Sequence, residues 1–279
     1  MRCAWDQLLR ILPTTVRADV DRLGCNTLQE LRLRVGGHPQ LVLGGESGWL
    51  SCITNDAELA FVVNAASRYS PWSAATAAQG YLTAPGGHRI GMCGEAVINR
   101  GEMTGIRHVS SLCIRVARDF PGIAEKLRAL QGNILILGPP GSGKTTLLRD
   151  LIRQIADMGS GSIAVVDERG ELFPDGFARG RTTDVMTGCS KYRGLETALR
   201  TMGPSCIAMD EITAQEDCQA LSQALWCGVR LIATAHASCM QDLLTRPVYA
   251  PIRESGCFDT VVILQRDKSW RTERMAKWN

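Results

Sequence analysis

The sequence of 279 residues has few aromatic residues and little excess of charge of either sign. Aromatic side chains make up 5% of the chain and the formal net charge is +3, so the composition gives neither the basic field nor the stacking platform of a nucleic-acid-binding protein. No apolar run approaches the roughly 18 residues that span a bilayer. The N-terminal stretch, with Asp6 and Arg10, lacks the apolar core of a signal peptide. We therefore expect no membrane-spanning segment and no nucleic-acid partner.

The eleven cysteines do not form the pattern of a disulfide framework or of a zinc site. Their number is odd, no two are spaced as C-x-x-C, and several, such as Cys206 and Cys257, lie within apolar runs. We interpret them as reduced, mostly buried small hydrophobic residues of a cytosolic protein.

One glycine-rich stretch stands between an apolar run and an amphipathic run. Residues 138–145 fit G-x-x-x-x-G-K-[ST], the P-loop (Walker A) pattern, with a short buried strand expected at Ile134–Leu137 and a helix over 146–155. In such a loop backbone N–H groups face phosphate oxygens, Lys144 reaches the β- and γ-phosphates, and the Thr145 hydroxyl binds Mg²⁺. We predict binding of ATP or GTP with Mg²⁺. The expected cofactor-binding residues in this stretch are Gly138, Pro139, Pro140, Gly141, Ser142, Gly143, Lys144, Thr145 and Thr146.

Four apolar runs downstream of the loop have the length of buried strands, and polar residues follow each of them. Apolar strands that alternate with helices are typical of a parallel sheet covered on both faces. In an open sheet of this kind ligands bind at the carboxyl ends of the strands, where these polar residues lie. The expected strands are Ile163–Val166, Cys206–Met209, Leu231–Thr234 and Val261–Leu264.

The residues before the loop have a different pattern, with shorter elements and many turns. Residues 28–35 and 40–43 are expected to form a hairpin, and 81–116 to add strands in which glycines mark bulges or close approaches of another backbone. Helices are expected over 1–12, 15–23, 57–68, 73–79 and 123–130. We therefore predict an α/β protein, in which an α+β N-terminal domain (1–125) precedes a RecA-like P-loop ATPase domain with a mostly parallel sheet (126–279).

Acidic residues follow two of the expected strands and supply candidates for metal binding and catalysis. Asp210 is expected to hold Mg²⁺, and Glu211 to polarise the attacking water. Asp167 and Glu168, after another strand, compete for the Mg²⁺ role, and Glu168 is the candidate for positioning the water. The alternative is that the residues around Asp167 form a structural ion-pair cluster with Arg169.

Histidine and arginine side chains are the candidates for contacting the phosphates. His236, at a strand end, either senses the γ-phosphate or is a hydrogen-bonded structural residue. Arg200 lies on an expected helix, where the alternative is a surface charge, and Arg181 lies in a polar loop. Arg89, beside His88 in the first domain, is a candidate phosphate or subunit contact, with a solvated turn as its alternative. Arg107, Arg115 and Arg179 are further candidates.

Four blocks together resemble the type II/type IV secretion ATPase superfamily: the loop 138–145 and the stretches Val165–Glu171, Leu199–Ile212 and Ala233–Ala237. Asp210 replaces the glycine that is usual in the third block. From about residue 28 to 265 the chain is more closely similar to the stage III sporulation protein AA family. That likeness adds Pro85–Arg89, Arg181–Val185 and Arg246-Pro247, whereas the basic residues that the family tends to carry after Asp-Glu-Ile are absent at Thr213–Glu216.

This resemblance implies a cytoplasmic ATPase of the mother cell, peripheral at the outer forespore membrane. The enzyme would be a ring hexamer that works with a membrane-embedded, secretion-like channel during sporulation. It would bind ATP between subunits, with arginines of the first domain completing the neighbouring site. The alternatives are a nucleic-acid-associated AAA-like ATPase, and a scaffold that binds ATP without significant hydrolysis.

Overall fold

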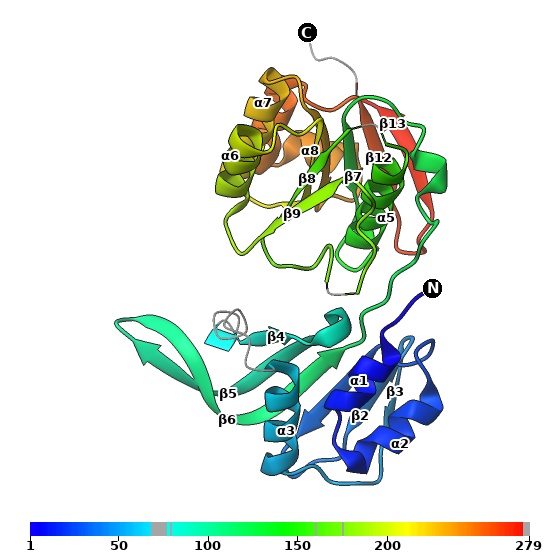
Figure 1. Ribbon diagram of the computed structural model, residues 1–279, viewed down its shortest axis with the longest axis vertical. Helices are drawn as coiled ribbons and strands as arrows, with labels where there is room; N and C mark the ends of the chain where they lie inside the picture. Colours follow the sequence, from blue (N-terminus) through cyan, green and yellow to red (C-terminus); the bar gives the residue numbers. More distant parts are fainter. Residues whose placement is uncertain (68–76, 79, 160, 175, 276–279) are drawn as a thin grey trace. The chain divides into compact units, whose positions relative to one another are not determined.

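The computed structural model describes residues 1–67, 77–78, 80–159, 161–174 and 176–275 (Figure 1). The chain divides into two units, one made of Met1–Asp119 with Pro174–Phe177 and the other of Phe120–Phe173 with Ala178–Asn279. This division falls a few residues before the predicted boundary between residues 125 and 126. The helix expected near 73–79 lies almost entirely outside the described residues.

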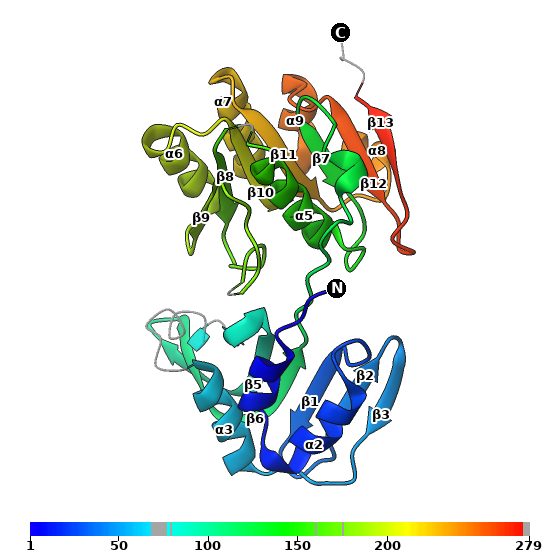
Figure 2. The same ribbon diagram turned by 45° about the vertical axis from the view of Figure 1, so that its right-hand side comes forward.

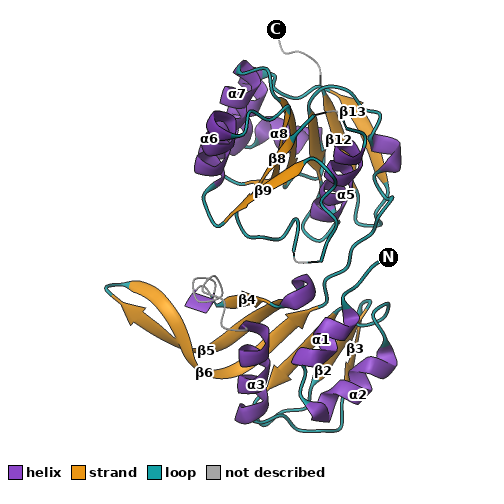
Figure 3. Cartoon of the chain, viewed as in Figure 1, coloured by secondary structure: helices purple, strands orange, loops and turns teal. Residues whose placement is uncertain are grey.

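An antiparallel sheet of six strands forms the centre of the first unit, in the order β3-β2-β1-β6-β5-β4 (Figure 3). The predicted hairpin is confirmed, because β1 pairs with β2 in antiparallel register. Leu31 and Leu33 of β1 are buried in the core with residues of the helices, and the alternating Arg32 is half-buried on the other face. The strands are β1 (Glu30–Arg34), β2 (Gln40–Leu43), β3 (Glu46–Trp49), β4 (Tyr81–Thr83), β5 (Arg89–Asn99) and β6 (Glu102–Arg115), and the helices are α1 (Trp5–Ile11), α2 (Thr14–Leu23), α3 (Asp56–Ser67) and the 3₁₀ turn η1 (Pro85–Gly87).

Strands β5 and β6 continue as a two-stranded ribbon past the residues that pair with β4 and β1 (Figure 1). The register of this ribbon shifts between Cys93 and Glu95, so a bulge lies at Gly94. A Cβ atom at Gly94 would lie 2.8 Å from the carbonyl oxygens of Arg107 and His108. The glycine therefore marks both a bulge and a close approach of another backbone, as the sequence predicts.

The second unit is built on a seven-stranded sheet in the order β13-β12-β7-β11-β10-β8-β9. Every neighbouring pair is parallel except β12 with β13, so the predicted mostly parallel sheet is confirmed. All four strands expected after the loop are present, and two more occupy the edges of the sheet. The strands are β7 (Ile134–Leu137), β8 (Ile163–Asp167), β9 (Thr183–Thr187), β10 (Cys206–Ile212), β11 (Arg230–Ala235), β12 (Thr260–Leu264) and β13 (Trp270–Arg274).

Helices cover both faces of this sheet (Figure 2), and successive side chains of β7 point alternately into the two cores that these helices form. Ile134 and Ile136 pack in one core with the apolar stripe of α5, while Leu135 and Leu137 pack in a second core with residues of α6, α7 and α9. The helix expected over 123–130 is instead a single 3₁₀ turn. The helical elements are η2 (Glu125–Leu127), α5 (Lys144–Asp157), α6 (Lys191–Thr201), α7 (Gln215–Trp226), α8 (Met240–Thr245), η3 (Pro247–Tyr249) and α9 (Ala250–Ser255).

No helix in the described part of the chain combines the length and the apolar character that crossing a membrane requires.

Candidate functional site

The glycine-rich loop, residues 138–143, joins the end of β7 to the first residue of α5. Gly141 and Gly143 have φ values of 74° and 100°, in the left-handed region that side chains disfavour. A Cβ atom at Gly138 would lie 2.5 Å from Ser142 Oγ and 2.9 Å from the carbonyl oxygen of Leu264. The shape of the loop therefore requires glycine at these positions, and the first N–H groups of α5, which directly follows the loop, have no acceptor within the helix.

The ammonium group of Lys144 is buried at the base of this loop. Its Nζ donates hydrogen bonds to the carbonyl oxygens of Gly138 and Pro139, at 2.9 and 3.1 Å, and to Nδ1 of His236 at 3.0 Å. Burial lowers the pKa of Lys144, and the negative charges of Asp210 and Glu211 partly oppose this shift. The structure thus brings together the predicted loop lysine and the predicted histidine.

His236 links Lys144 to Glu211. Because Nδ1 of His236 accepts from the lysine, its Nε2 carries the proton and donates to Oε1 of Glu211 at 2.5 Å. The other carboxylate oxygen of Glu211 lies 3.8 Å from a guanidinium nitrogen of Arg169. Arg169 therefore lies beside the candidate catalytic glutamate. The alternative from the sequence was that Arg169 pairs with the acidic residues around Asp167, and the contact with Glu211 differs from that arrangement.

The two predicted Mg²⁺-binding residues are in direct contact. Thr145 Oγ1 donates to Oδ2 of Asp210 at 2.7 Å, and Thr234 Oγ1 donates to Oδ1 at 2.6 Å. Thr234 is completely buried, and sequence analysis did not select it as a site residue. A threonine directly after the apolar run Leu231–Ala233 was the available signal, because a buried hydroxyl needs a hydrogen-bond partner.

Glu211 has an unusual backbone conformation for a residue in a strand. Its φ is 57°, in the left-handed region, and the pairing of β10 with β11 shifts register between Met209 and Ile212. Its N–H donates to the side chain of Thr234 at 2.8 Å. This bulge directs Glu211 out of the regular strand alternation, at a cost of about 1–3 kcal/mol, and such strain is concentrated at functional sites.

Asp167 holds the loop that follows β8. Its carboxylate accepts N–H bonds from Glu171, Leu172 and Phe173, at 2.9, 2.8 and 3.4 Å. Arg149 of α5 donates to the carbonyl oxygens of Glu171 and Leu172 in the same loop. Burial raises the pKa of Asp167 to about 6, although these N–H bonds act in the opposite direction. The contacts of Asp167 are thus those of a residue that fixes a loop, and they do not support its alternative role in binding Mg²⁺.

Glu168 pairs with Lys191, at 3.2 Å, and not with the Lys144–His236–Glu211 row. Lys191 is largely buried and also lies 3.6 Å from Asp217, whose carboxylate accepts the N–H groups of Thr213 and Ala214 at the start of α7. Lys191 therefore joins the end of β8 to the segment that follows β10, and sequence analysis missed it.

The candidate arginines lie in three different settings. Arg200 is exposed and pairs with Glu196, one turn earlier on α6, at 2.8 Å, which favours the alternative of a surface charge. Arg181 is exposed, and its backbone N–H donates to Asp157. Arg89, in the first unit, lies 4.5 Å above the ring centroid of Tyr81.

His88, the neighbour of Arg89, is completely buried and has a structural role. Its Nε2 donates to the carbonyl oxygen of Ala4, and its Nδ1 accepts the N–H of Ala117. Burial lowers the pKa of His88, which keeps the ring neutral. The interpretation of His88 as a phosphate contact is therefore not supported.

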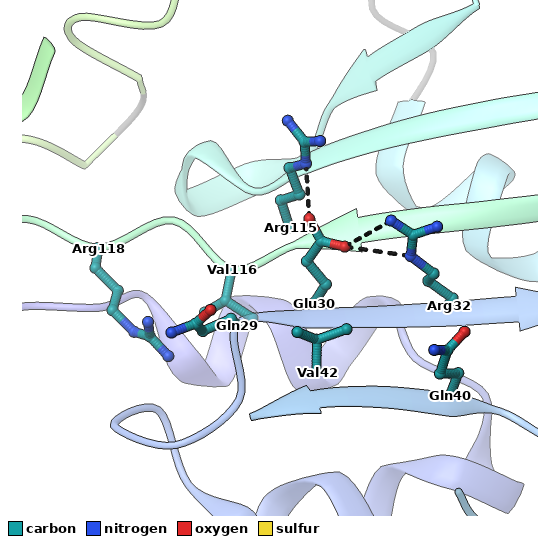
Figure 4. A pocket seen from close by; sticks show the side chains of 8 residues that line it. All are labelled: Gln29, Glu30, Arg32, Gln40, Val42, Arg115, Val116 and Arg118. Atoms are coloured by element: carbon teal, nitrogen blue, oxygen red, sulfur yellow. Dashed lines mark hydrogen bonds and ion pairs between the residues drawn. The ribbon is translucent and has the colours of Figure 1, made fainter. Parts of the chain in front are cut away.

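A shallow groove lies on the open face of the first unit's sheet, and Arg115 lines it (Figure 4). Glu30 stands between Arg32 and Arg115, with oxygen–nitrogen distances of 3.0 and 3.1 Å. Burial alone would raise the pKa of Glu30, but the two guanidinium groups outweigh it and lower the pKa. The single negative charge of Glu30 is therefore shared between Arg115 and Arg32, so it compensates only part of the positive charge of Arg115.

Comparison with known proteins assigns a family to almost the whole chain. The family model described as sporulation stage III, protein AA matches residues 4–274. The chain belongs to this family. It is 32% identical over 284 residues to stage III sporulation protein AA of Bacillus subtilis strain 168, covering 94% of this chain and 92% of that protein. The chain is also similar to the Arabidopsis thaliana protein SEEDLING PLASTID DEVELOPMENT 1, with 33% identity over 148 residues. This match covers 50% of this chain and 22% of the Arabidopsis protein.

Solved structures of similar fold include a bacterial ATPase and a pilus retraction motor. The Legionella pneumophila ATPase DotB matches with a TM-score of 0.59 and 17% identity, over 94% of this chain and 81% of DotB. The pilus retraction motor PilT, solved with ADP, matches with a TM-score of 0.62 and 16% identity, over 90% of this chain and 78% of PilT. These matches confirm the predicted fold class, a RecA-like unit with a mostly parallel sheet preceded by a smaller α+β unit.

Proposed function

We propose that this protein binds and hydrolyses ATP with Mg²⁺, as the motor of a secretion-like channel complex in sporulation. The observation that carries this proposal is the hydrogen-bonded row Lys144–His236–Glu211 beside the contact of Thr145 with Asp210. These five side chains converge at the carboxyl edge of a parallel sheet, next to a loop whose backbone requires glycine.

The loop residues fit a bound polyphosphate. Within the described residues, Ser142 Oγ is the buried side-chain oxygen that has no hydrogen-bond partner, and it lies in this loop. A hydroxyl in that position can donate to an anionic oxygen, as can the N–H groups at the start of α5. Thr145 and Asp210 supply the hard oxygen ligands that Mg²⁺ prefers, and the bound ion would neutralise charge on the phosphates.

The side chains of the row divide the work between binding and proton transfer. Lys144 exchanges its three acceptors, the carbonyl oxygens of Gly138 and Pro139 and Nδ1 of His236, for phosphate oxygens, so that Nδ1 of His236 is released. Glu211 accepts the proton of the attacking water on Oε2, because Oε1 is held by the His236 N–H at 2.5 Å. His236 thereby reports to Glu211 whether Lys144 has engaged a phosphate.

The remaining assignments belong to the proposed assembly. We infer a ring hexamer, peripheral to the outer forespore membrane on the cytoplasmic, mother-cell side, that acts on membrane-embedded channel proteins. In this assembly Glu168 positions water, and Arg89 and Arg181 supply positive charge, Arg89 from a neighbouring subunit. What supports this assembly is the family membership and the shared fold.

Hydrolysis by the purified full chain tests the proposal. Mg²⁺-dependent phosphate release is measured for the natural protein, Glu211→Gln and Lys144→Ala, together with binding of ATP by calorimetry. We expect Glu211→Gln to bind ATP but to hydrolyse it about 10²–10⁴-fold more slowly, and Lys144→Ala to bind poorly. Binding without measurable hydrolysis in the natural protein, across the concentration range in which it assembles, would favour the scaffold alternative.

A further inference from the structure

The turn between β12 and β13 lies directly against the glycine-rich loop. Nζ of Lys268 donates a hydrogen bond of 2.6 Å to the carbonyl oxygen of Gly141. The side chains of Leu264 and Lys268 both come within 4.0 Å of where a Cβ atom at Gly143 would stand. Segments 127 residues apart in the sequence therefore share one wall of the candidate nucleotide site.

The backbone at Lys268 is one that glycine would adopt more easily. The N–H of Lys268 donates to the carbonyl of Gln265, the N–H of Gln265 donates to the carbonyl of Ser269, and Lys268 has a φ of 72°. Glycine is the usual residue at a left-handed position that closes a hairpin turn. A lysine there is strained, and an outlier of this kind points to a use for the side chain.

The sheet order gives a bound nucleotide a direction. β12 lies on one side of β7, and β11 followed by β10 lies on the other. Asp210 and Glu211 belong to β10, and His236 directly follows β11. Since these residues act on the terminal phosphate in the proposed function, that phosphate faces β11 and the nucleoside end faces the β12–β13 turn.

We propose that Lys268 is a further nucleotide-binding residue, which pairs with the phosphate next to the nucleoside. This inference rests on the proposed function. Lys268 is exposed, so its flexible side chain can exchange the Gly141 carbonyl for a phosphate oxygen, a stronger partner because it is charged. Lys144 then serves the terminal end of the polyphosphate and Lys268 the inner end. Affinity for ADP and for ATP therefore depends on Lys268 to the same extent.

Calorimetric titration of the full chain with MgADP and with MgATP tests this inference. Lys268→Gly keeps the backbone that the turn prefers, Lys268→Arg restores the cation, and Arg266→Gln removes an exposed cation from the same turn as a matched control. We expect Lys268→Gly to weaken both nucleotides by about tenfold, Lys268→Arg to recover most of the loss, and Arg266→Gln to stay within about twofold of the natural chain. Resistance of Lys268→Gly to urea should equal or exceed that of the natural chain, which excludes misfolding as the cause.

Equal affinity in Lys268→Gly and the natural chain would overturn the inference, as would an equal loss in Arg266→Gln. Neither result would affect the proposed function, provided that the natural chain binds ATP and Lys144→Ala does not. If the natural chain binds neither MgADP nor MgATP, the proposed function and this inference both fail.

Discussion

Replacing Glu211 by glycine separates the strain at the site from its chemistry. A left-handed φ costs an L-residue about 1–2 kcal/mol, whereas the extra freedom of glycine in the unfolded chain costs about 0.5–1 kcal/mol. Glu211→Gly and Glu211→Ala both remove the carboxylate, so the loss of its contacts with His236 and Arg169 cancels in the comparison. We therefore expect Glu211→Gly to be about 1 kcal/mol more stable than Glu211→Ala, since φ is 57° at this position.

Urea denaturation followed by circular dichroism measures the difference in stability, and phosphate release measures the chemistry. Both variants should lose ATP hydrolysis by about 10²–10⁴-fold, the usual contribution of a general base. If Glu211→Gly proves less stable than Glu211→Ala, the inference that the left-handed backbone at residue 211 is strained is wrong. If either variant hydrolyses ATP at the natural rate, Glu211 is not the base.

Three other changes test the surroundings of the site. Thr234→Val keeps the shape of a buried side chain but leaves Asp210 without one donor, and should lower the free energy of unfolding in urea by about 1–3 kcal/mol. Gly138→Ala places a methyl group against the Leu264 carbonyl, and calorimetry should find ATP binding abolished in a folded chain. The pKa of Asp167 is raised to about 6 in the folded chain, so its proton stabilises the fold at low pH and this stabilisation is lost as pH rises towards and through 6. The free energy of unfolding of the natural chain minus that of Asp167→Asn should therefore fall by about 1–1.5 kcal/mol from pH 5 to pH 7.5, and a rise in this signed difference would contradict the raised pKa.

Local sequence patterns were sufficient for the core of the second unit. The apolar run before Gly138 and the amphipathic run after Thr145 predicted β7 and α5, because burial on both faces of a strand and on one face of a helix leaves a periodic trace. The edge strands β9 and β13 escaped prediction. Their residues are only partly buried, so their sequences lack that trace.

The candidate site was predictable where a residue's role follows from its neighbours in the sequence, and not where the role depends on a distant partner. Lys144 and Asp210 stand within recognisable motifs. Lys191 and Lys268 became visible only through contacts with Glu168 and with the Gly141 carbonyl, because their local sequences resemble those of any exposed lysine. The strand order that gives the nucleotide a direction is a property of long-range pairing, which periodicity does not encode.

The loop after β8 depends on two side chains from outside it, and this dependence limits which substitutions the sequence can accept. Its N–H groups are satisfied by Asp167 of the sheet, and its carbonyl oxygens by Arg149 of the helix on the other side. Loss of either side chain leaves buried backbone groups of the loop unpaired, and the remaining side chain cannot replace it because a carboxylate accepts hydrogen bonds whereas a guanidinium donates them. Substitution of both Asp167 and Arg149 is therefore expected to destabilise the loop more than substitution of either one, so a sequence that keeps this loop has to keep both side chains.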